Sequence, residues 1–146
     1  MPGRTARTLG TIVAIVGIVM VIAGGVTYYM VHNELKAANI TVADDAAFLA
    51  GDEVDGPFTA YAQAQVIDKH ALEATDGKTY AQLDRDDPLR QTAMSASFLR
   101  ASLFTSVVAF GVAAMAIVLG LMQVLIGWAL VSLSRREEVA YEKAPA

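Results

Sequence analysis

The chain has 146 residues, of which 55% are hydrophobic and 18% charged, with a formal net charge of −4. It contains no cysteine, which excludes disulfides, thiolate metal sites and cysteine nucleophiles. Charged residues are absent from two long runs, 9–31 and 101–134. The residues outside these runs are too few to form a large soluble core.

The first run predicts a transmembrane helix over residues 9–31, after a short cytoplasmic N-terminus of residues 1–8. A bilayer core needs roughly 20 apolar residues of helix. A cleaved secretory signal is the competing interpretation, with Arg4 and Arg7 as its basic region and an apolar stretch ending near Gly24. The run is longer than the apolar region of an ordinary signal, so we favour a span.

An acidic segment follows, and we assign residues 32–87 to an extracytoplasmic region. Between residues 32 and 100 there are 12 acidic and 6 basic residues, a charge that excludes nucleic acid as a partner. A helix is predicted over about 57–75, because Asp-Gly-Pro introduces it and Asp76-Gly77 ends it. Residues 39–53 are expected to be irregular or short β.

Asp86, Asp87 and Pro88 predict the start of the last helix, because proline suits a first helical position. No further proline occurs before Pro145, so this helix is expected to reach about Arg135, roughly 70 Å at 1.5 Å per residue. That length predicts a helical stalk over residues 88–107, a second transmembrane helix over 108–131 and a cytoplasmic tail over 132–146.

Small apolar residues form a stripe on the 57–75 helix that we expect to pack against the stalk. The stripe consists of Ala60, Ala64, Ile67, Ala71 and Ala74, and the stalk face of Ala96, Leu99 and Leu103.

Basic residues beside the spans predict that both termini are cytoplasmic, because Lys and Arg are retained on that side. These topology residues are Arg4, Arg7, Arg135 and Arg136. Arg100, beside the second run on the outer side, opposes the rule. Tyr28 and Tyr29 are expected to anchor the outer membrane interface, and Trp128 the inner one.

Small residues recur every seven positions in both runs and therefore line one face of each helix. They are Gly10, Gly17 and Gly24 in the first run, and Ser106, Ala113, Gly120 and Gly127 in the second. Small faces let helix backbones approach closely in lipid, so we expect the two faces to pack as an antiparallel hairpin or against another subunit. Gln123 is the strong polar side chain at membrane depth, and we expect it to hydrogen-bond across a helix interface.

Few residues are candidates for a catalytic or metal-binding role. The two histidines, His32 and His70, have no spacing typical of metal ligands, and His70 and Glu73 are placed for a local pair. The carboxylates between residues 44 and 55 lack the spacing of a calcium loop. We therefore expect no catalytic, cofactor-binding or metal-binding residues and no cofactor.

Residues 56–115 contain the sequence GPFTAYAQAQVIDKHALEATDGKTYAQLDRDDPLRQTAMSASFLRASLFTSVVAFGVAAM, which resembles a family of short two-span membrane proteins from high-GC actinobacteria. The resemblance implies a cell-membrane location and supplies no functional residues. Some members carry an automatic label of aromatic ring-opening dioxygenase, which the residues here do not support.

Together these features predict a mainly α fold: a two-helix antiparallel transmembrane hairpin with a small helical extracytoplasmic domain and a long second helix that extends out of the membrane. The expected function is a non-enzymatic accessory or structural subunit in the cell membrane, with lipid and another membrane protein or a second copy as partners. The alternatives are a metal-dependent oxygenase, which needs both His32 and His70, and a sensor that uses Tyr61, Gln65 and an acidic patch. The acidic patch consists of Asp44, Asp45, Asp52, Glu53 and Asp55.

Overall fold

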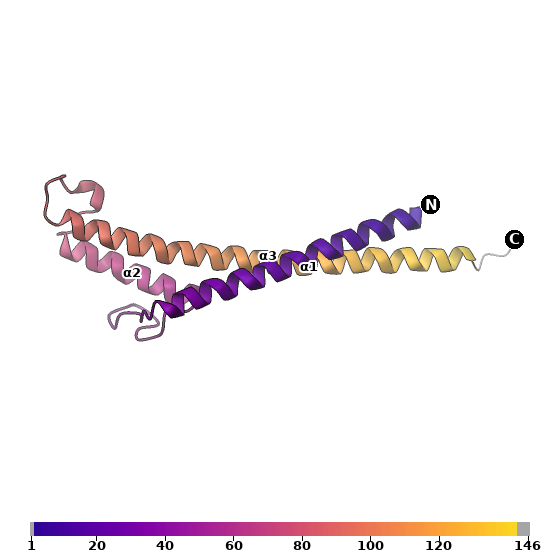
Figure 1. The fold of residues 1–146 in the computed structure, drawn as a ribbon, viewed down its shortest axis with the longest axis horizontal. Coiled ribbons are helices and arrows are strands. Elements are labelled where there is room, and N and C mark those ends of the chain that lie inside the picture. The colour runs from indigo at the N-terminus through magenta and orange to yellow at the C-terminus, as the bar shows by residue number, and fades with distance from the viewer. Residues whose placement is uncertain (1, 143–146) are drawn as a thin grey trace. The chain divides into compact units, whose positions relative to one another are not determined.

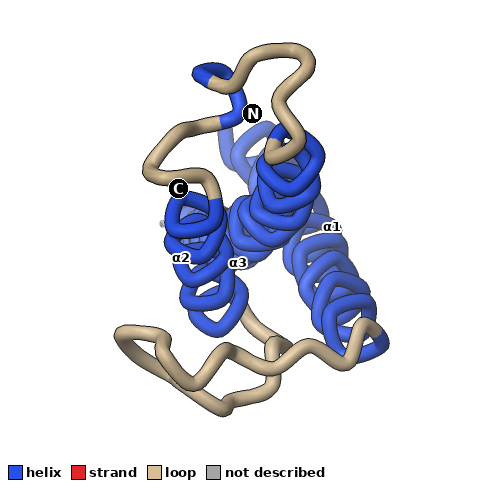
Figure 2. Tube along the Cα trace, turned by 90° about the vertical axis from the view of Figure 1, so that its left-hand side faces the viewer, coloured by secondary structure: helices blue, strands red, loops and turns tan. Residues whose placement is uncertain are grey.

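A computed structural model describes the backbone of residues 2–142 and the side chains of residues 4–135. Within that range the chain forms helices α1 (Pro2–Ala37), α2 (Pro57–Ala74) and α3 (Arg90–Glu142), with a short 3₁₀ helix η1 (Tyr80–Gln82) (Figure 1). The described residues contain no β-strand, only an isolated antiparallel bridge between Thr41 and Glu53 (Figure 2). The protein is therefore mainly helical.

Two of these helices are long and apolar enough to cross a membrane. The most hydrophobic stretches of α1 and α3 have mean hydropathies of 2.6 and 2.4. Both helices continue well beyond the charge-free runs, and α1 ends only where Asn39 adopts the left-handed conformation, with a φ of 48°. A left-handed residue just after a helix stops it, because the next amides bond back to the preceding turn.

Helix α2 begins at Pro57, directly after Asp55 and Gly56. The Thr59 hydroxyl oxygen accepts hydrogen bonds from the amides of Gly56, at 3.1 Å, and Asp55, at 3.2 Å, and so satisfies donors before the first turn. The helix ends at Ala74, where the Gly77 amide donates to the Leu72 carbonyl at 2.7 Å. Asp76 and Gly77 both have positive φ there, which explains the stop.

The start of α3 corrects one expectation, because the first helical residue is Arg90 and Pro88 lies in the turn before the helix. The Asp87 carboxylate accepts a hydrogen bond from the Leu89 amide at 2.8 Å, an Asx turn that holds Pro88 outside the helix. The first bond of the helix then runs from the Ala93 amide to the Leu89 carbonyl, at 3.0 Å.

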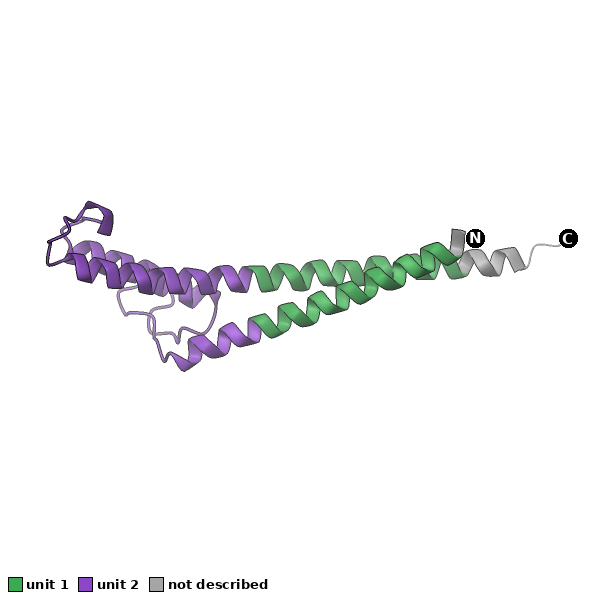
Figure 3. Cartoon of the chain, turned by 45° about the horizontal axis from the view of Figure 1, so that its top comes forward, with its two compact units in different colours: residues 1–27, 112–146 green, residues 28–111 purple. Residues whose placement is uncertain are grey.

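The chain divides into two compact units, shown in Figure 3. Unit 1 comprises residues 1–27 and 112–146, and unit 2 comprises residues 28–111. In unit 2 the end of α1, the loop, α2 and the first part of α3 share one hydrophobic core. Its buried members are Leu35, Val42, Val54, Ala60, Ala62, Ala64, Leu103 and Phe110.

The contact of α2 with α3 in unit 2 differs in part from the predicted one. Ala60, Ala64 and Leu103 are buried in the core, and Ile67 packs against it. Ala74 is exposed at the last turn of α2, and Leu99 is 56% exposed on the side of α3 that α2 does not cover. The face of α3 toward α2 instead carries Arg100, whose guanidinium lies 2.9 Å from the Asp68 carboxylate. Leu99, one residue earlier, is turned about 100° away by the helical twist.

Candidate functional site

In unit 1 the predicted small residues of α1 and α3 lie against one another. A Cβ added to Gly17 would lie 2.5 Å from the Gly120 carbonyl oxygen, and one added to Gly24 would lie 2.7 Å from that of Ala113. The third pair, Gly10 with the Gly127 carbonyl, is at 2.8 Å. A step of seven residues forward along α1 corresponds to a step of seven residues backward along α3. The two helices are therefore antiparallel and keep one register over all three pairs.

Only glycine permits this contact. A real Cβ essentially never lies within 3.0 Å of a heavy atom, and the nearest atoms here belong to the opposite backbone, which cannot rotate away. Close backbones gain dispersion contacts along their whole length, which is how helices associate in lipid. Gly25 and Gly111 provide the contrast, because an added Cβ would meet nothing within 4 Å at either position.

The fourth small residue predicted on α3, Ser106, lies outside unit 1. It belongs to unit 2, and its hydroxyl donates to the Ser102 carbonyl of its own helix at 3.3 Å. The helix-packing site of unit 1 therefore consists of Gly10, Gly17, Gly24, Ala113, Gly120 and Gly127.

Gln123 lies beside the middle of this site, with its Cβ 3.0 Å from the Cβ position of Gly17. Its side-chain oxygen is buried and has no hydrogen-bond partner among the described residues, so the bond expected across the helices is not made by this oxygen. A buried acceptor without a partner costs about 1 to 3 kcal/mol.

The outward faces of unit 1 are aliphatic. On α1, Ile12, Ile15, Val19 and Ile22 are all about half exposed or more, and on α3 the same holds for Val118, Leu121 and Leu125. The anchor Trp128 is 69% exposed on α3. In this unit the small residues face inward and the large ones outward, the reverse of a helical pair that folds in water.

The remaining topology and anchor residues are placed as follows. Arg4, Arg7 and Arg135 are exposed, whereas the side chain of Arg136 lies outside the described residues. Tyr28 packs edge-on against Phe110, with ring centroids 4.7 Å apart, and the Tyr29 side chain is exposed.

The two histidines have different partners. His32 Nδ1 lies 2.7 Å from the Asp55 carbonyl oxygen and must donate to it, which ties the start of α2 to α1. His70 Nε2 lies 2.9 Å from Asp45 Oδ2, so the predicted local pair with Glu73 is replaced by one with the loop. No group of three or more His, Asp or Glu side chains in the described part of the chain is arranged to hold a metal ion.

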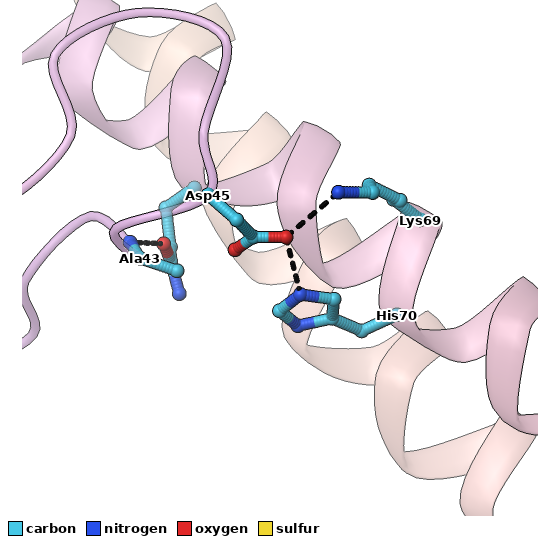
Figure 4. Close-up of polar contacts among 5 residues, drawn as sticks. Ala43, Asp45, Lys69 and His70 are labelled. Atoms are coloured by element: carbon cyan, nitrogen blue, oxygen red, sulfur yellow. Dashed lines mark hydrogen bonds and ion pairs between the residues drawn. The ribbon is translucent and has the colours of Figure 1, made fainter.

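Figure 4 shows the loop contact, in which one Asp45 oxygen accepts from both Lys69, at 2.8 Å, and His70. The hydrogen bond from Lys69, followed by that from His70, lowers the pKa of Asp45 to about 2, and the same contact raises the pKa of Lys69. Nearby, the Gln63 side-chain oxygen accepts from the Ala43 amide at 2.9 Å. These contacts hold the loop on α2.

Tyr61 and Gln65, the residues of the predicted sensor site, are hydrogen-bonded to each other. Gln65 Nε2 donates to the Tyr61 hydroxyl at 2.7 Å, and the Tyr61 ring packs edge-on against Phe104 of α3, with centroids 5.8 Å apart. The hydrogen bond lies within α2, and the Tyr61 ring contributes to the packing of α2 on α3.

Comparison with known proteins adds no functional assignment: no family model matches the chain, and neither the curated proteins nor the solved structures include a significant match.

Proposed function

We propose that the chain is a two-span membrane protein of the cell membrane, with unit 1 as an antiparallel helical hairpin in the bilayer and unit 2 as a small extracytoplasmic domain. The observation that carries this proposal is the inverted arrangement of unit 1, with glycine inside and large aliphatic side chains outside. Removing apolar surface from water stabilises a protein by about 25 cal/mol per Å². Exposing these aliphatic faces to water is therefore unfavourable, and covering them with lipid is favourable.

The orientation with both termini in the cytoplasm is supported by the exposed Arg4, Arg7 and Arg135. Arg100, which opposes the rule in the sequence, is paired with Asp68 of α2, so its charge is compensated within unit 2. A reporter fused at the C-terminus tests this orientation, with a second fused at Gly51 of the exposed loop. Activity of an export-dependent reporter at the C-terminus would contradict it.

The role we propose is that of a non-enzymatic accessory or structural subunit. It is supported by Phe98 and Leu99, which are 73% and 56% exposed on the side of α3 that α2 leaves uncovered. Exposed large apolar side chains outside the spans are typical of protein contacts. A second membrane protein or another copy of this chain would cover them.

A photo-crosslinking amino acid at position 98 in whole cells tests the subunit role, with the same group at the exposed Glu73 of α2 as the control. We expect one discrete adduct from position 98 and none from position 73. An adduct of twice the chain mass would identify self-association. The absence of any protein adduct at position 98 would contradict the subunit role.

A further inference from the structure

Unit 2 carries a contiguous exposed apolar patch, formed by Phe48, Leu49, Phe58 and Tyr61, which we call the aromatic patch. Phe58 is 74% exposed, and Phe48, Leu49 and Tyr61 are each about 40% exposed. The Phe48 and Tyr61 rings have centroids 6.3 Å apart. Phe58 and Tyr61 are three residues apart on α2 and are therefore neighbours on its surface.

The patch lies toward the end of unit 2 at which the chain enters the predicted spans. The contacts Tyr61 with Phe104 and Asp68 with Arg100 show that α2 and α3 are antiparallel. Phe58 is one turn before Tyr61, so it is level with the turn of α3 after Phe104, where the predicted second span begins at residue 108. The His32 bond to the Asp55 carbonyl likewise places the start of α2 one turn of α1 beyond Tyr28.

We propose that the aromatic patch contacts the outer surface of the bilayer, with Phe58 seated at the boundary between headgroups and acyl chains. Aromatic and leucine side chains favour this layer, and amphipathic elements enter it by about 5 to 10 Å. The inference rests on the proposed membrane embedding of unit 1, because the chain passes directly from that unit into unit 2 after residue 27 and back into it after residue 111. It gives the start of α2 a lipid-contacting role.

The charges around the patch bear on which lipid headgroups it can contact. Asp44 and Asp52 are exposed on the same loop as Phe48, Glu53 lies 3.9 Å from the Lys36 ammonium group, and residues 32–100 carry a net charge of −6. Anionic headgroups would be repelled by this loop, so the patch fits a zwitterionic surface. A protein covering the patch is the competing occupant, and the experiment below separates the two.

Tryptophan fluorescence in vesicles tests the proposal, because Trp128 is the single tryptophan of the chain. In a Trp128→Phe background, Phe58→Trp places the probe in the patch, and Glu73→Trp is the control, at an exposed position near the other end of the same helix. Phe48→Trp is a second patch probe. The full-length variants are reconstituted in phosphatidylcholine vesicles that contain lipid brominated near the headgroup end of the acyl chain.

We expect brominated lipid to quench the Phe58→Trp and Phe48→Trp variants, whereas the Glu73→Trp variant is quenched by acrylamide in the water. Quenching of both patch variants by acrylamide alone would overturn the proposal. Shielding of these variants from both quenchers would also overturn it, since a protein would then cover the patch. The native Trp128 reports whether unit 1 is embedded in the bilayer. If brominated lipid does not quench Trp128, the proposed function is wrong. If it quenches Trp128 but neither patch variant, only the inference about the patch is wrong.

Discussion

Gly17→Ala is the substitution that most directly probes the helix contact of unit 1. The new methyl group would lie 2.5 Å from the Gly120 carbonyl oxygen and 2.9 Å from the Val124 amide nitrogen. Ordinary contact begins at 3.4 Å, so the helices must separate by about 0.9 Å, which is 3.4 Å less 2.5 Å. A gap of that size forfeits a quarter to a half of each dispersion contact that it opens.

The expected cost follows from two opposed effects. Overpacking costs about 1 to 3 kcal/mol, and replacing glycine by alanine in a helix returns up to about 1 kcal/mol. Taking about 2 kcal/mol as the middle of the overpacking range and about 1 kcal/mol as the helix gain, we expect Gly17→Ala to weaken the helix pairing by about 1 kcal/mol, roughly fivefold in the equilibrium constant. Gly25→Ala is the matched control, because its methyl group meets nothing within 4 Å and only the propensity gain remains.

Energy transfer between two dyes measures the pairing. The chain has no cysteine, so Thr5→Cys and Leu133→Cys, both exposed in unit 1, provide the labelling sites. The labelled protein is titrated with a denaturing detergent in mixed micelles, and the loss of transfer gives the midpoint of helix separation. A lower midpoint for Gly17→Ala and an unchanged or higher one for Gly25→Ala is expected. Equal midpoints for the two variants would refute the glycine contact.

Three further experiments test other contacts. Gln123→Met removes the unpartnered buried oxygen and should raise the stability of unit 1 by about 1 to 3 kcal/mol in the same assay; a loss of stability would show that the amide has a partner. A double-mutant cycle with Asp68→Asn and Arg100→Gln should give a coupling of about 0.2 to 1 kcal/mol that shrinks with salt, as for exposed pairs; a salt-independent coupling would contradict this. The pKa of Asp45, lowered to about 2 by Lys69 and His70, should move toward 3.8 in Lys69→Met when followed by carboxyl NMR. Because the folded-state pKa is the lower one, the loop contact should be intact above about pH 4 and be lost as the pH falls through about 2; a contact that persists below that pH would contradict the assignment.

Much of the fold could be predicted from local patterns in the sequence. The charge-free runs, the seven-residue spacing of glycine and the Asp-Gly-Pro start of α2 depend on neighbouring residues, and helix geometry converts them directly into faces and ends. The start of α3 at Pro88 was predicted wrongly from its local pattern. The Asp87 carboxylate accepts a hydrogen bond from the Leu89 amide, and the helix begins at Arg90.

Long-range contacts were not predictable in this way. Asp45 pairs with residues 24 and 25 positions later, and that pairing depends on the path of a loop with positive φ at Asn39 and Leu49. Asn39 is a residue type that tolerates positive φ, but Leu49 is not, so no sequence signal marks the turn at Leu49. The outward direction of Leu99 has a similar origin, because only the rotation of α3 against α2 decides which apolar side chains are covered.

Spin-label accessibility in reconstituted vesicles tests the central claim that lipid surrounds unit 1. Single cysteines replace Leu121, on the exposed face of α3 in unit 1, and Glu73, which is exposed on α2 in unit 2. We expect a label at 121 to be reached by oxygen, which dissolves in lipid, and not by a water-soluble nickel chelate, whereas a label at 73 is reached by the nickel chelate. Ready access of the nickel chelate to position 121 would place that face in water and contradict the account.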